Sequence, residues 1–228
     1  MSFDTRRLSR RAQGLLAGGA SSEYLQRHSE GLSDVFDPVV NPNGYIGLCE
    51  AENRLVAEMV ADRLDRVPRV PSVALGYDAM TGSVRFREQL GRFMGRTLLG
   101  REFGRQQISV LAGAGCVLEL LFYALGDPGD GVLVPTPSYA GFWLDLELRN
   151  GLTIVPVHRS SDDDFRLTPE MLDRAVAGAG RPIKALLFTS PDNPLGTVAS
   201  PEEISRVLAW ADGRDLHVIF DEIYALSV

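Results

Sequence analysis

The sequence predicts an α/β fold with a mainly parallel sheet in its second half, preceded by a smaller, mainly helical part. From residue 105 onward, short runs rich in Val, Ile, Leu and Phe alternate with stretches of helical pattern. This alternation is typical of parallel strands joined by crossover helices. The chain has 228 residues and 45% hydrophobic content, which is enough to bury the core of one large domain.

Five apolar runs are expected to form the strands of this sheet, because each is rich in residues that favour buried strands. They are residues 108–112, 131–135, 153–157, 183–189 and 216–221. Helices are expected between them near residues 116–125, 139–149, 169–177 and 201–212. Two of these helices have clear start signals, since Thr168 and Ser200 are favourable N-caps that each precede a proline. Three glycines are expected just past helix ends: Gly126, Gly178 and Gly213.

The first hundred residues follow a different pattern, in which helices are expected near residues 51–66 and 83–99. An extended, proline-marked segment at residues 67–75 separates them. We therefore expect two domains. Residues 1–75 would form an N-terminal arm and part of a small domain, and residues 76–228 an incomplete large domain.

Charge and composition argue against several kinds of partner. The formal net charge of −7 disfavours binding to nucleic acid or to an anionic membrane, since both need a basic face. No run approaches the roughly 18 apolar residues of a membrane-spanning helix. Cys49 and Cys116 are too few for a disulfide framework, so we expect single buried thiols in a reducing compartment. The three histidines, His28, His158 and His217, are scattered, and no metal site is expected.

The N-terminal segment raises the question of a targeting signal. Arg6, Arg7, Arg10 and Arg11 precede an apolar patch at residues 15–20. That patch is shorter than the about 7 to 15 residues of a signal-peptide core, and it contains two glycines. A solvated arm is therefore the favoured interpretation, and the cytoplasm is the expected location.

Two polar residues lie where neighbouring strands should end. Asp221 closes the apolar run VIFD, and Asn193 follows the strand at 183–189 in the motif SPDNPLGT. Ligands of open parallel sheets collect at the carboxyl ends of strands, and a partly buried carboxylate there can pair with a cation. For either residue alone, a turn cap at Asp221 or an Asx-type turn at Asn193 is the simpler explanation. Their occurrence in consecutive strands favours a shared ligand site.

Five segments, in order along the chain, carry a resemblance to a known family. They are NGYIGLCEAENRL at 43–55, GYDAMTGSVRFRE at 76–88, LAGAGCVLELLFYALGDPGDGVLVPTPSYAGF at 111–142, SPDNPLGT at 190–197 and FDEIY at 220–224. These segments resemble fold-type I pyridoxal-phosphate enzymes of the class I/II aminotransferase family. The AENRL ending is similar to the branch that holds 1-aminocyclopropane-1-carboxylate synthases and their aminotransferase relatives.

The resemblance implies an aminotransferase-like, three-layer α/β/α large domain that binds pyridoxal 5′-phosphate, with part of a small domain before it. In the family the sheet has seven strands, and about five would lie in this chain. The other two would lie between the strands at 216–221 and 108–112. Both of these strands would then face an open gap.

The resemblance also implies how the cofactor ring is held. Asp221 would pair with the pyridine nitrogen, and Asn193 and Tyr224 would hydrogen-bond the phenolic oxygen. Tyr139 would stack on the ring face, although ordinary packing of Tyr139 is an alternative.

The phosphate would lie at the start of the helix that contains Ala114, Gly115 and Cys116. Relatives usually carry a serine or threonine where this chain has Gly115, so a hydroxyl contact to phosphate is missing. Backbone N–H groups at the helix start would remain as donors. A dinucleotide-binding loop is a rival explanation, but Leu118 stands in place of its third glycine, and Pro135 ends the next strand where an acidic residue is required.

Two further residues are implied to act on the substrate side or across subunits. Tyr77 matches a tyrosine that reaches the phosphate of a neighbouring subunit's cofactor, which implies a homologous second subunit. Glu52 matches a substrate-side loop, and Asn193 would also face the amino-acid substrate. An N-cap or a surface ion pair is an equally acceptable explanation for Glu50 and Glu52.

The lysine that tethers the cofactor as a Schiff base is expected outside this chain. Lys184 is the only lysine, and it lies in the strand at 183–189 ahead of the motif, so it does not match that position. No catalytic residue is therefore expected here, and the chain alone should be inactive. A complementary C-terminal chain supplying the lysine and the missing strands is the favoured explanation. A fragment of a longer enzyme, or a non-catalytic binding or regulatory module, are the alternatives.

Overall fold

The computed structural model describes residues 7–17, 23–67 and 69–227. Arg6 and part of the apolar patch at 15–20 lie outside the described residues. The chain divides into two compact units, Met1–Leu75 and Gly76–Val228, which are considered separately below. No helix in the described ranges is long and apolar enough to cross a membrane.

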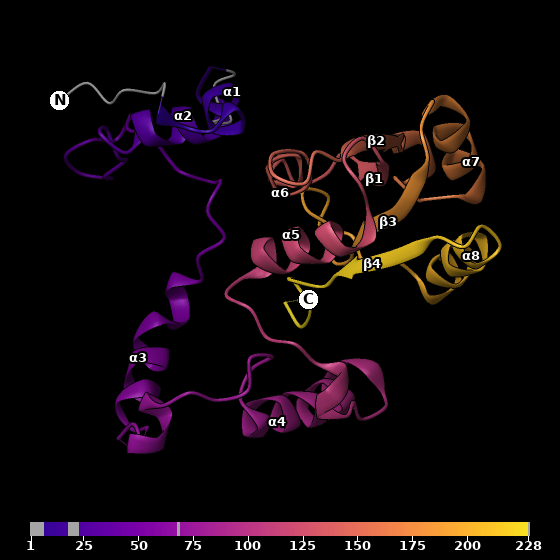
Figure 1. The fold of residues 1–228 in the computed structure, drawn as a ribbon. Helices are drawn as coiled ribbons and strands as arrows, with labels where there is room; N and C mark the ends of the chain where they lie inside the picture. Colours follow the sequence, from indigo (N-terminus) through magenta and orange to yellow (C-terminus); the bar gives the residue numbers. More distant parts are fainter. Residues whose placement is uncertain (1–6, 18–22, 68, 228) are drawn as a thin grey trace. The chain divides into compact units, whose positions relative to one another are not determined.

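A four-stranded parallel sheet forms the centre of the second unit (Figure 1). Its order is β2 (Thr153–His158), β1 (Gly131–Thr136), β3 (Ile183–Thr189) and β4 (His217–Asp221). The register of β3 and β4 runs from Ala185 opposite His217 to Thr189 opposite Asp221. The predicted α/β class and parallel sheet are therefore confirmed.

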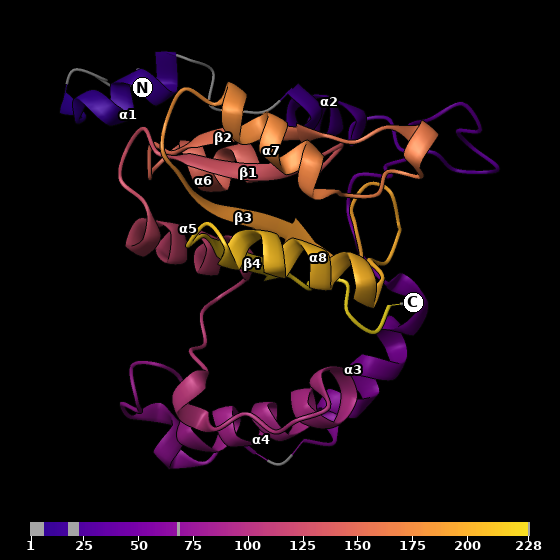
Figure 2. The ribbon, with the colours of Figure 1, turned by 90° about the vertical axis from the view of Figure 1, so that its right-hand side faces the viewer.

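Two layers of helices cover the sheet, because successive strand side chains point to opposite faces. Val132 packs with α5 and α6 on one face, and Leu133 packs with α7 and α8 on the other. Figure 2 shows α7 and α8 together on one side of the strands. The helices of this unit are α4 (Val84–Met94), α5 (Ala114–Leu125), α6 (Phe142–Glu147), α7 (Pro169–Gly178) and α8 (Pro201–Asp212).

The predicted N-caps form as expected. The Thr168 side chain accepts a hydrogen bond from the Met171 amide, and the Ser200 side chain accepts one from the Glu203 amide. Helix α8 has the predicted bounds, whereas α6 is shorter than the predicted helix at 139–149. Proline and cap signals therefore located helix starts more reliably than apolar pattern alone did.

The expected strand at residues 108–112 is wrong, and the described residues contain four strands where five were expected. This segment runs as irregular chain, and its Val110 amide donates to the Thr81 carbonyl at 3.0 Å. A strand needs a ladder partner for its backbone groups, and no strand in the described chain lies beside this segment. The outer edge of β4 likewise has no pairing strand among the described residues.

Helix α4 and the chain around it are fastened by a buried arginine. Ser83 caps α4, which continues as a π-helix over Gly95–Leu99, so the helix predicted at 83–99 is present. The Arg87 guanidinium donates to the Gly82 carbonyl and to the Arg105 carbonyl, each at 2.9 Å. Short 3-10 turns complete the unit at Arg105–Gln107 and Ser161–Asp163.

The first unit is mainly helical, as predicted. It contains α1 (Arg10–Ala17), α2 (Glu23–Gly31) and α3 (Ala57–Asp65), with 3-10 turns at Arg54–Val56 and Ser72–Leu75. The buried His28 of α2 contacts Tyr45 and Glu50, with 3.0 Å from Nδ1 to the tyrosine oxygen and 3.0 Å from Nε2 to the carboxylate. These contacts join α2 to the segment that leads towards α3.

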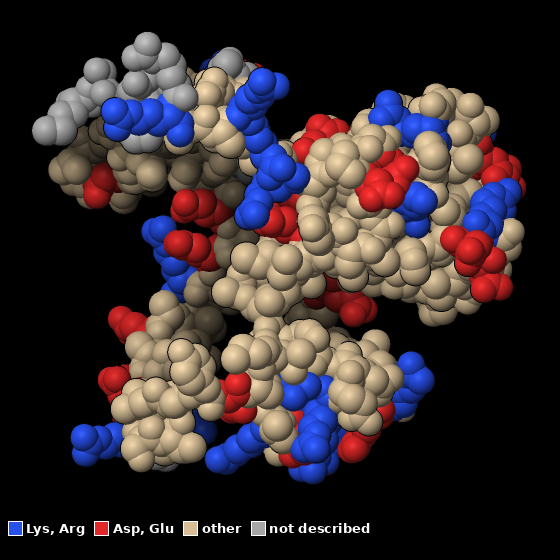
Figure 3. All heavy atoms as spheres, in the orientation of Figure 1, with Lys and Arg blue, Asp and Glu red and all other residues tan. Residues whose placement is uncertain are grey.

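Figure 3 shows acidic and basic side chains interspersed over the face of the second unit that it presents. Both cysteines are exposed, so the expectation of buried thiols is wrong. Cys116 lies in the first turn of α5, and this turn is exposed.

Candidate functional site

Asn193 and Tyr224 meet at the carboxyl edge of the sheet. Asn193 follows β3, Tyr224 follows β4, and the Asn193 Nδ2 donates to the Tyr224 hydroxyl oxygen at 2.8 Å although the residues are 31 positions apart. The two strands are parallel neighbours, so their loops leave the sheet side by side. Both side chains are half-buried.

Asp192, and not Asn193, closes the turn in the SPDNPLGT loop. Its Oδ1 accepts a hydrogen bond from the Leu195 amide at 3.2 Å, and its own amide donates to the Thr197 carbonyl at 2.8 Å. Gly196 has a φ of 69°, a left-handed conformation that favours glycine. The Asx-type turn considered for Asn193 is thus made by its neighbour, which leaves the Asn193 amide group for Tyr224.

A buried ion pair, which sequence reasoning missed, holds this loop in place. The Arg159 Nη2 lies 2.9 Å from the Asp192 Oδ2, and the two side chains are only 4% and 8% exposed. The same Nη2 donates to the Pro137 carbonyl at 2.8 Å. One guanidinium therefore ties together the chain segments that follow β1, β2 and β3.

Asp221 ends β4 on the face covered by α5 and α6. Ile219 packs against that face and Phe220 against the opposite one, so the period of two places Asp221 with Ile219. Its Oδ1 accepts a hydrogen bond from the Ile223 amide at 3.2 Å, so the considered turn cap is present. Burial raises the pKa of Asp221, and the Ile223 hydrogen bond opposes this only in part. No cation pairs with this carboxylate among the described residues.

The first turn of α5 presents backbone donors on the face of the sheet where Asp221 ends β4. Gly113, with a φ of 89°, precedes the helix, and the amides of Ala114, Gly115 and Cys116 belong to the turn that has no intrahelical acceptor. This turn is exposed, apart from the partly buried Ala114. It therefore offers amides and partial positive charge to an anion.

Asp145 of α6 is a further acidic residue at this edge that the sequence reasoning missed. Its Oδ1 lies 3.2 Å from the position that a Cβ on Gly115 would take. Burial raises the pKa of Asp145 most, followed by the negative charges of Asp221 and Glu119. Asp145 lies one helical turn beyond Phe142 and belongs to no recognisable motif. The sequence therefore did not reveal it, because only the fold brings α6 next to the start of α5.

Tyr139 lies just before α6 and packs edge-on against Phe142. The ring centroids are 5.4 Å apart with an interplanar angle of 88°, and Tyr139 keeps 41% exposure. Beside it, the Ser138 Oγ is buried without a hydrogen-bond partner among the described residues. The aromatic packing considered for Tyr139 is present, and a large part of the side chain remains open.

The other predicted residues are Tyr77 of the second unit and Glu52 of the first unit. Tyr77 is fully exposed in the second unit. Glu52 lies in the first unit and pairs with Arg54, with 2.9 Å between its Oε2 and the Nη2. The surface ion pair considered for Glu52 is therefore present, while Glu50 pairs with His28.

Lys184 lies at the wrong end of β3 for the candidate site. Its Nζ is 3.7 Å from the Asp130 Oδ2, close to the start of β1. Five steps along the strand, or about 17 Å at 3.3 Å per residue, separate it from Thr189 at the carboxyl end. No group of three or more His, Cys, Asp or Glu side chains in the described parts of the chain is suited to a metal ion.

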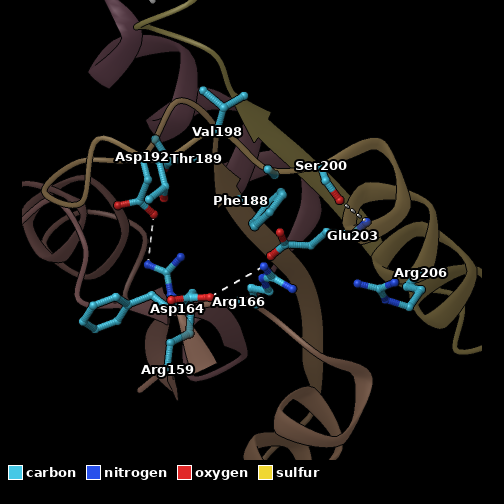
Figure 4. Close-up of a pocket in the computed structure, with 13 residues that line it drawn as sticks. Arg159, Asp164, Arg166, Phe188, Thr189, Asp192, Val198, Ser200, Glu203 and Arg206 are labelled. Carbon is cyan, nitrogen blue, oxygen red and sulfur yellow. Dashed lines mark hydrogen bonds and ion pairs between the residues drawn. The ribbon is translucent and has the colours of Figure 1, made fainter. Parts of the chain in front are cut away.

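A pocket of about 440 Å³ lies on the α7 and α8 side of the same edge (Figure 4). Arg159, Phe188, Asp192 and Glu203 line it, and Figure 4 marks the Arg159–Asp192 ion pair with a dashed line. Neither Asn193 nor Asp221 is among the residues that line it. This pocket is therefore separate from the cluster around Asp221.

Residues 45–228 match the family described as aminotransferase class I and II. The chain is 32% identical over 223 residues to 1-aminocyclopropane-1-carboxylate synthase 2 of Solanum lycopersicum, with 92% of this chain and 46% of that protein covered. It is 36% identical over 224 residues to 1-aminocyclopropane-1-carboxylate synthase 3 of Oryza sativa subsp. japonica, with 93% and 49% covered. The chain thus spans about half the length of the curated relatives it matches.

Solved structures show the same likeness. Aspartate aminotransferase from Thermus thermophilus with maleate matches with a TM-score of 0.70 over 95% of this chain and 53% of that chain, at 24% identity, which is a likeness of fold. An aminotransferase from Mycobacterium tuberculosis matches with a TM-score of 0.58 at 26% identity, over 75% of this chain and 43% of that chain.

Proposed function

Because this chain belongs to the class I and II aminotransferase family, we propose that it supplies the N-terminal half of a pyridoxal-phosphate enzyme acting on an amino acid. The family resemblance predicted from five sequence segments is thereby confirmed, and the family depends on pyridoxal 5′-phosphate. The proposed reaction is amino transfer, or elimination and cyclisation of an activated amino acid. The observation that carries the proposal is the contact between Asn193 and Tyr224 at the sheet edge where Asp221 ends β4.

The residues at this edge suit the ring of the cofactor. Asp221 is a partly buried carboxylate without a cationic partner among the described residues, which is the setting in which a protonated pyridine nitrogen is bound strongly. Tyr224 accepts from Asn193 and so keeps its own hydrogen for another acceptor, and Asn193 keeps its second N–H. The Tyr224 hydroxyl and the Asn193 N–H therefore suit a phenolic oxygen as acceptor. The Asp221 carboxylate suits a protonated pyridine nitrogen.

The start of α5 suits the phosphate group less completely. The amides of Ala114, Gly115 and Cys116 are free to donate, and the helix start favours negative charge. Gly115 provides no hydroxyl, so binding here would rest on backbone groups alone.

These contacts suggest a separate role for each residue of the proposed site. The bound cofactor supplies an electron sink for the attached amino acid. Asp221 would keep the pyridine nitrogen protonated, and Asn193 with Tyr224 would hydrogen-bond the phenolic oxygen. Tyr139 would cover a ring face and exclude water from it. Glu52 and Asn193 are proposed to face the substrate.

The remaining half of the site is proposed to come from a complementary C-terminal chain or segment that brings the tethering lysine. The outer edge of β4, which no strand of the described residues pairs with, offers hydrogen bonds to a further strand. Helix α5 on the same sheet exposes Val117, Leu120 and Tyr123 at 40%, 51% and 76%. Tyr77 is proposed to serve a homologous second subunit. We also propose a cytoplasmic location, and inactivity of this chain by itself.

Cysteine alkylation tests the proposal, because Cys116 lies in the proposed phosphate turn and Cys49 lies in the other unit. The full chain is alkylated with and without pyridoxal phosphate, and both cysteine peptides are quantified by mass spectrometry. We expect the cofactor to slow alkylation of Cys116 and not of Cys49. Asp221→Ala should abolish this protection, since the ring loses its anionic partner.

A borohydride arm of the same experiment tests the placement of the lysine. We expect no cofactor to be trapped on Lys184, because it lies at the amino end of β3. Equal alkylation of Cys116 with and without cofactor, at cofactor concentrations up to the millimolar range, would contradict the proposed site.

A further inference from the structure

The carboxylate of Asp145 lies against the turn of α5 that is proposed to bind phosphate. Its Oδ1 is 3.2 Å from the place where a side chain on residue 115 would begin. Because residue 115 is a glycine, no side chain fills the space beside this turn, and the Asp145 carboxylate borders that space. An anion bound to the amides of the same turn would face this carboxylate at close range.

Asp145 has no hydrogen-bond or ion-pair partner among the described residues. Glu119 of α5, whose negative charge acts on Asp145, itself pairs with Arg149 at 3.0 Å. Asp221, at the end of β4, adds a second negative charge on the same face. The charged groups that act on Asp145 are Asp221 and Glu119, and Glu119 is itself paired with Arg149.

We propose that Asp145 is a positioning residue that controls how strongly the start of α5 takes a phosphate group, opposing the dianion when ionised and accepting it when protonated. This inference rests on the proposed function. An ionised Asp145 competes with phosphate for the positive field of the helix start and repels it directly. A protonated Asp145 removes the repulsion and offers an O–H donor.

The expected pH dependence follows from the direction of the shift. Burial and the neighbouring negative charges raise the pKa of Asp145 above 3.8, so the proton is retained to a higher pH than on an ordinary aspartate. Phosphate affinity should therefore rise as the pH falls towards that raised pKa. Phosphate itself gains a proton near pH 6, so sulfate, which stays dianionic, is included as a probe.

The test compares ligands with and without the phosphate group. Binding of pyridoxal phosphate, pyridoxal and sulfate to the full chain is measured by calorimetry at pH 5.5 and pH 8, for the wild type and Asp145→Asn. At pH 8 we expect the variant to bind pyridoxal phosphate and sulfate about tenfold more tightly, and pyridoxal within about twofold. The affinity for sulfate should also lose most of its pH dependence.

Glu119→Gln is the matched control, because it removes a carboxylate one turn farther from the start of α5. We expect a change of less than about threefold in the affinity for pyridoxal phosphate. If Asp145→Asn does not fold by circular dichroism, Asp145→Ser serves as the second variant. It removes the same carboxylate, and it should tighten sulfate binding in the same direction.

The outcomes separate the two proposals. If the wild type and Asp145→Asn bind pyridoxal phosphate equally while pyridoxal phosphate binds measurably, the role of Asp145 is refuted and the proposed function stands. If pyridoxal is tightened as much as pyridoxal phosphate, Asp145 acts on the fold and not on phosphate, which also refutes the role. If no variant binds either compound, the proposed function fails, and this inference fails with it.

Discussion

Replacing Arg159 with methionine should be among the most destabilising single changes in the second unit. The substitution keeps the apolar stem of the side chain and removes the guanidinium, which leaves the Asp192 carboxylate 8% exposed without its cation. Removal of one partner from a buried ion pair costs about 3 to 5 kcal/mol. For a unit of this size, that loss lowers the melting temperature by about 6 to 20 °C.

Urea unfolding followed by circular dichroism measures this loss, and Arg166→Met is the matched control. Arg166 lines the same pocket and lies 3.6 Å from Asp164, but the two side chains are 68% and 82% exposed. An exposed pair contributes about 0 to 1 kcal/mol, so the control should change the unfolding free energy little.

A double variant distinguishes the lost charge pair from lost packing. Arg159→Met combined with Asp192→Asn should be more stable than Arg159→Met alone by about 1 kcal/mol or more, because the buried charge is gone. If Arg159→Met costs no more than Arg166→Met, or if the double variant is less stable than Arg159→Met, the reasoning about this pair is refuted.

Two further predictions concern local signals and pH. Thr168→Ala and Ser200→Ala should each lower the unfolding free energy by about 1 kcal/mol, because each removes an N-cap acceptor; urea unfolding checks this, and a loss below a few tenths of a kcal/mol would count against it. For Asp221, whose raised pKa favours the neutral form, the stabilising contribution is present below pH 3.8 and is lost as the pH rises through the raised value. Asp221→Asn should therefore gain stability relative to the wild type as the pH is raised to 7, measured by thermal unfolding, and a constant difference between pH 3 and pH 7 would contradict the assignment.

The elements that the sequence located correctly are those set by neighbouring residues. Ser200, Pro201 and Glu203 lie within one turn of each other, and α8 begins where they predict. The strand at 183–189 is likewise a continuous apolar run, and it was found with its bounds. Local signals of this kind need no knowledge of the rest of the fold.

The elements that the sequence did not locate depend on distant partners. Residues 108–112 have the composition of a strand, yet a strand forms only where another strand supplies its hydrogen bonds. The pair of Arg159 and Asp192 spans 33 positions, and Asp145 meets the start of α5 only after α6 has packed. No pattern in the sequence marks such pairs before the topology is known.

The candidate site was predicted in part, for a related reason. Asn193 and Asp221 were recognised because strand ends gather ligands, and the structure brings Asn193 to Tyr224. Asp192 took the turn that had been considered for Asn193, because its carboxylate reaches the Leu195 amide. The roles of these residues towards the cofactor stay predictions.

The register of β3 with β4 decides which face of the sheet carries Asp221. Thr189 faces Asp221 at the last rung of the ladder, and side chains alternate strictly along each strand. A mispairing of one rung would turn Asp221 towards α7 and α8 and away from the start of α5. Only molecules with the native register of β3 and β4 would then carry the Asp221 carboxylate on the α5 face. A small molecule that binds this carboxylate would therefore select for correct strand pairing.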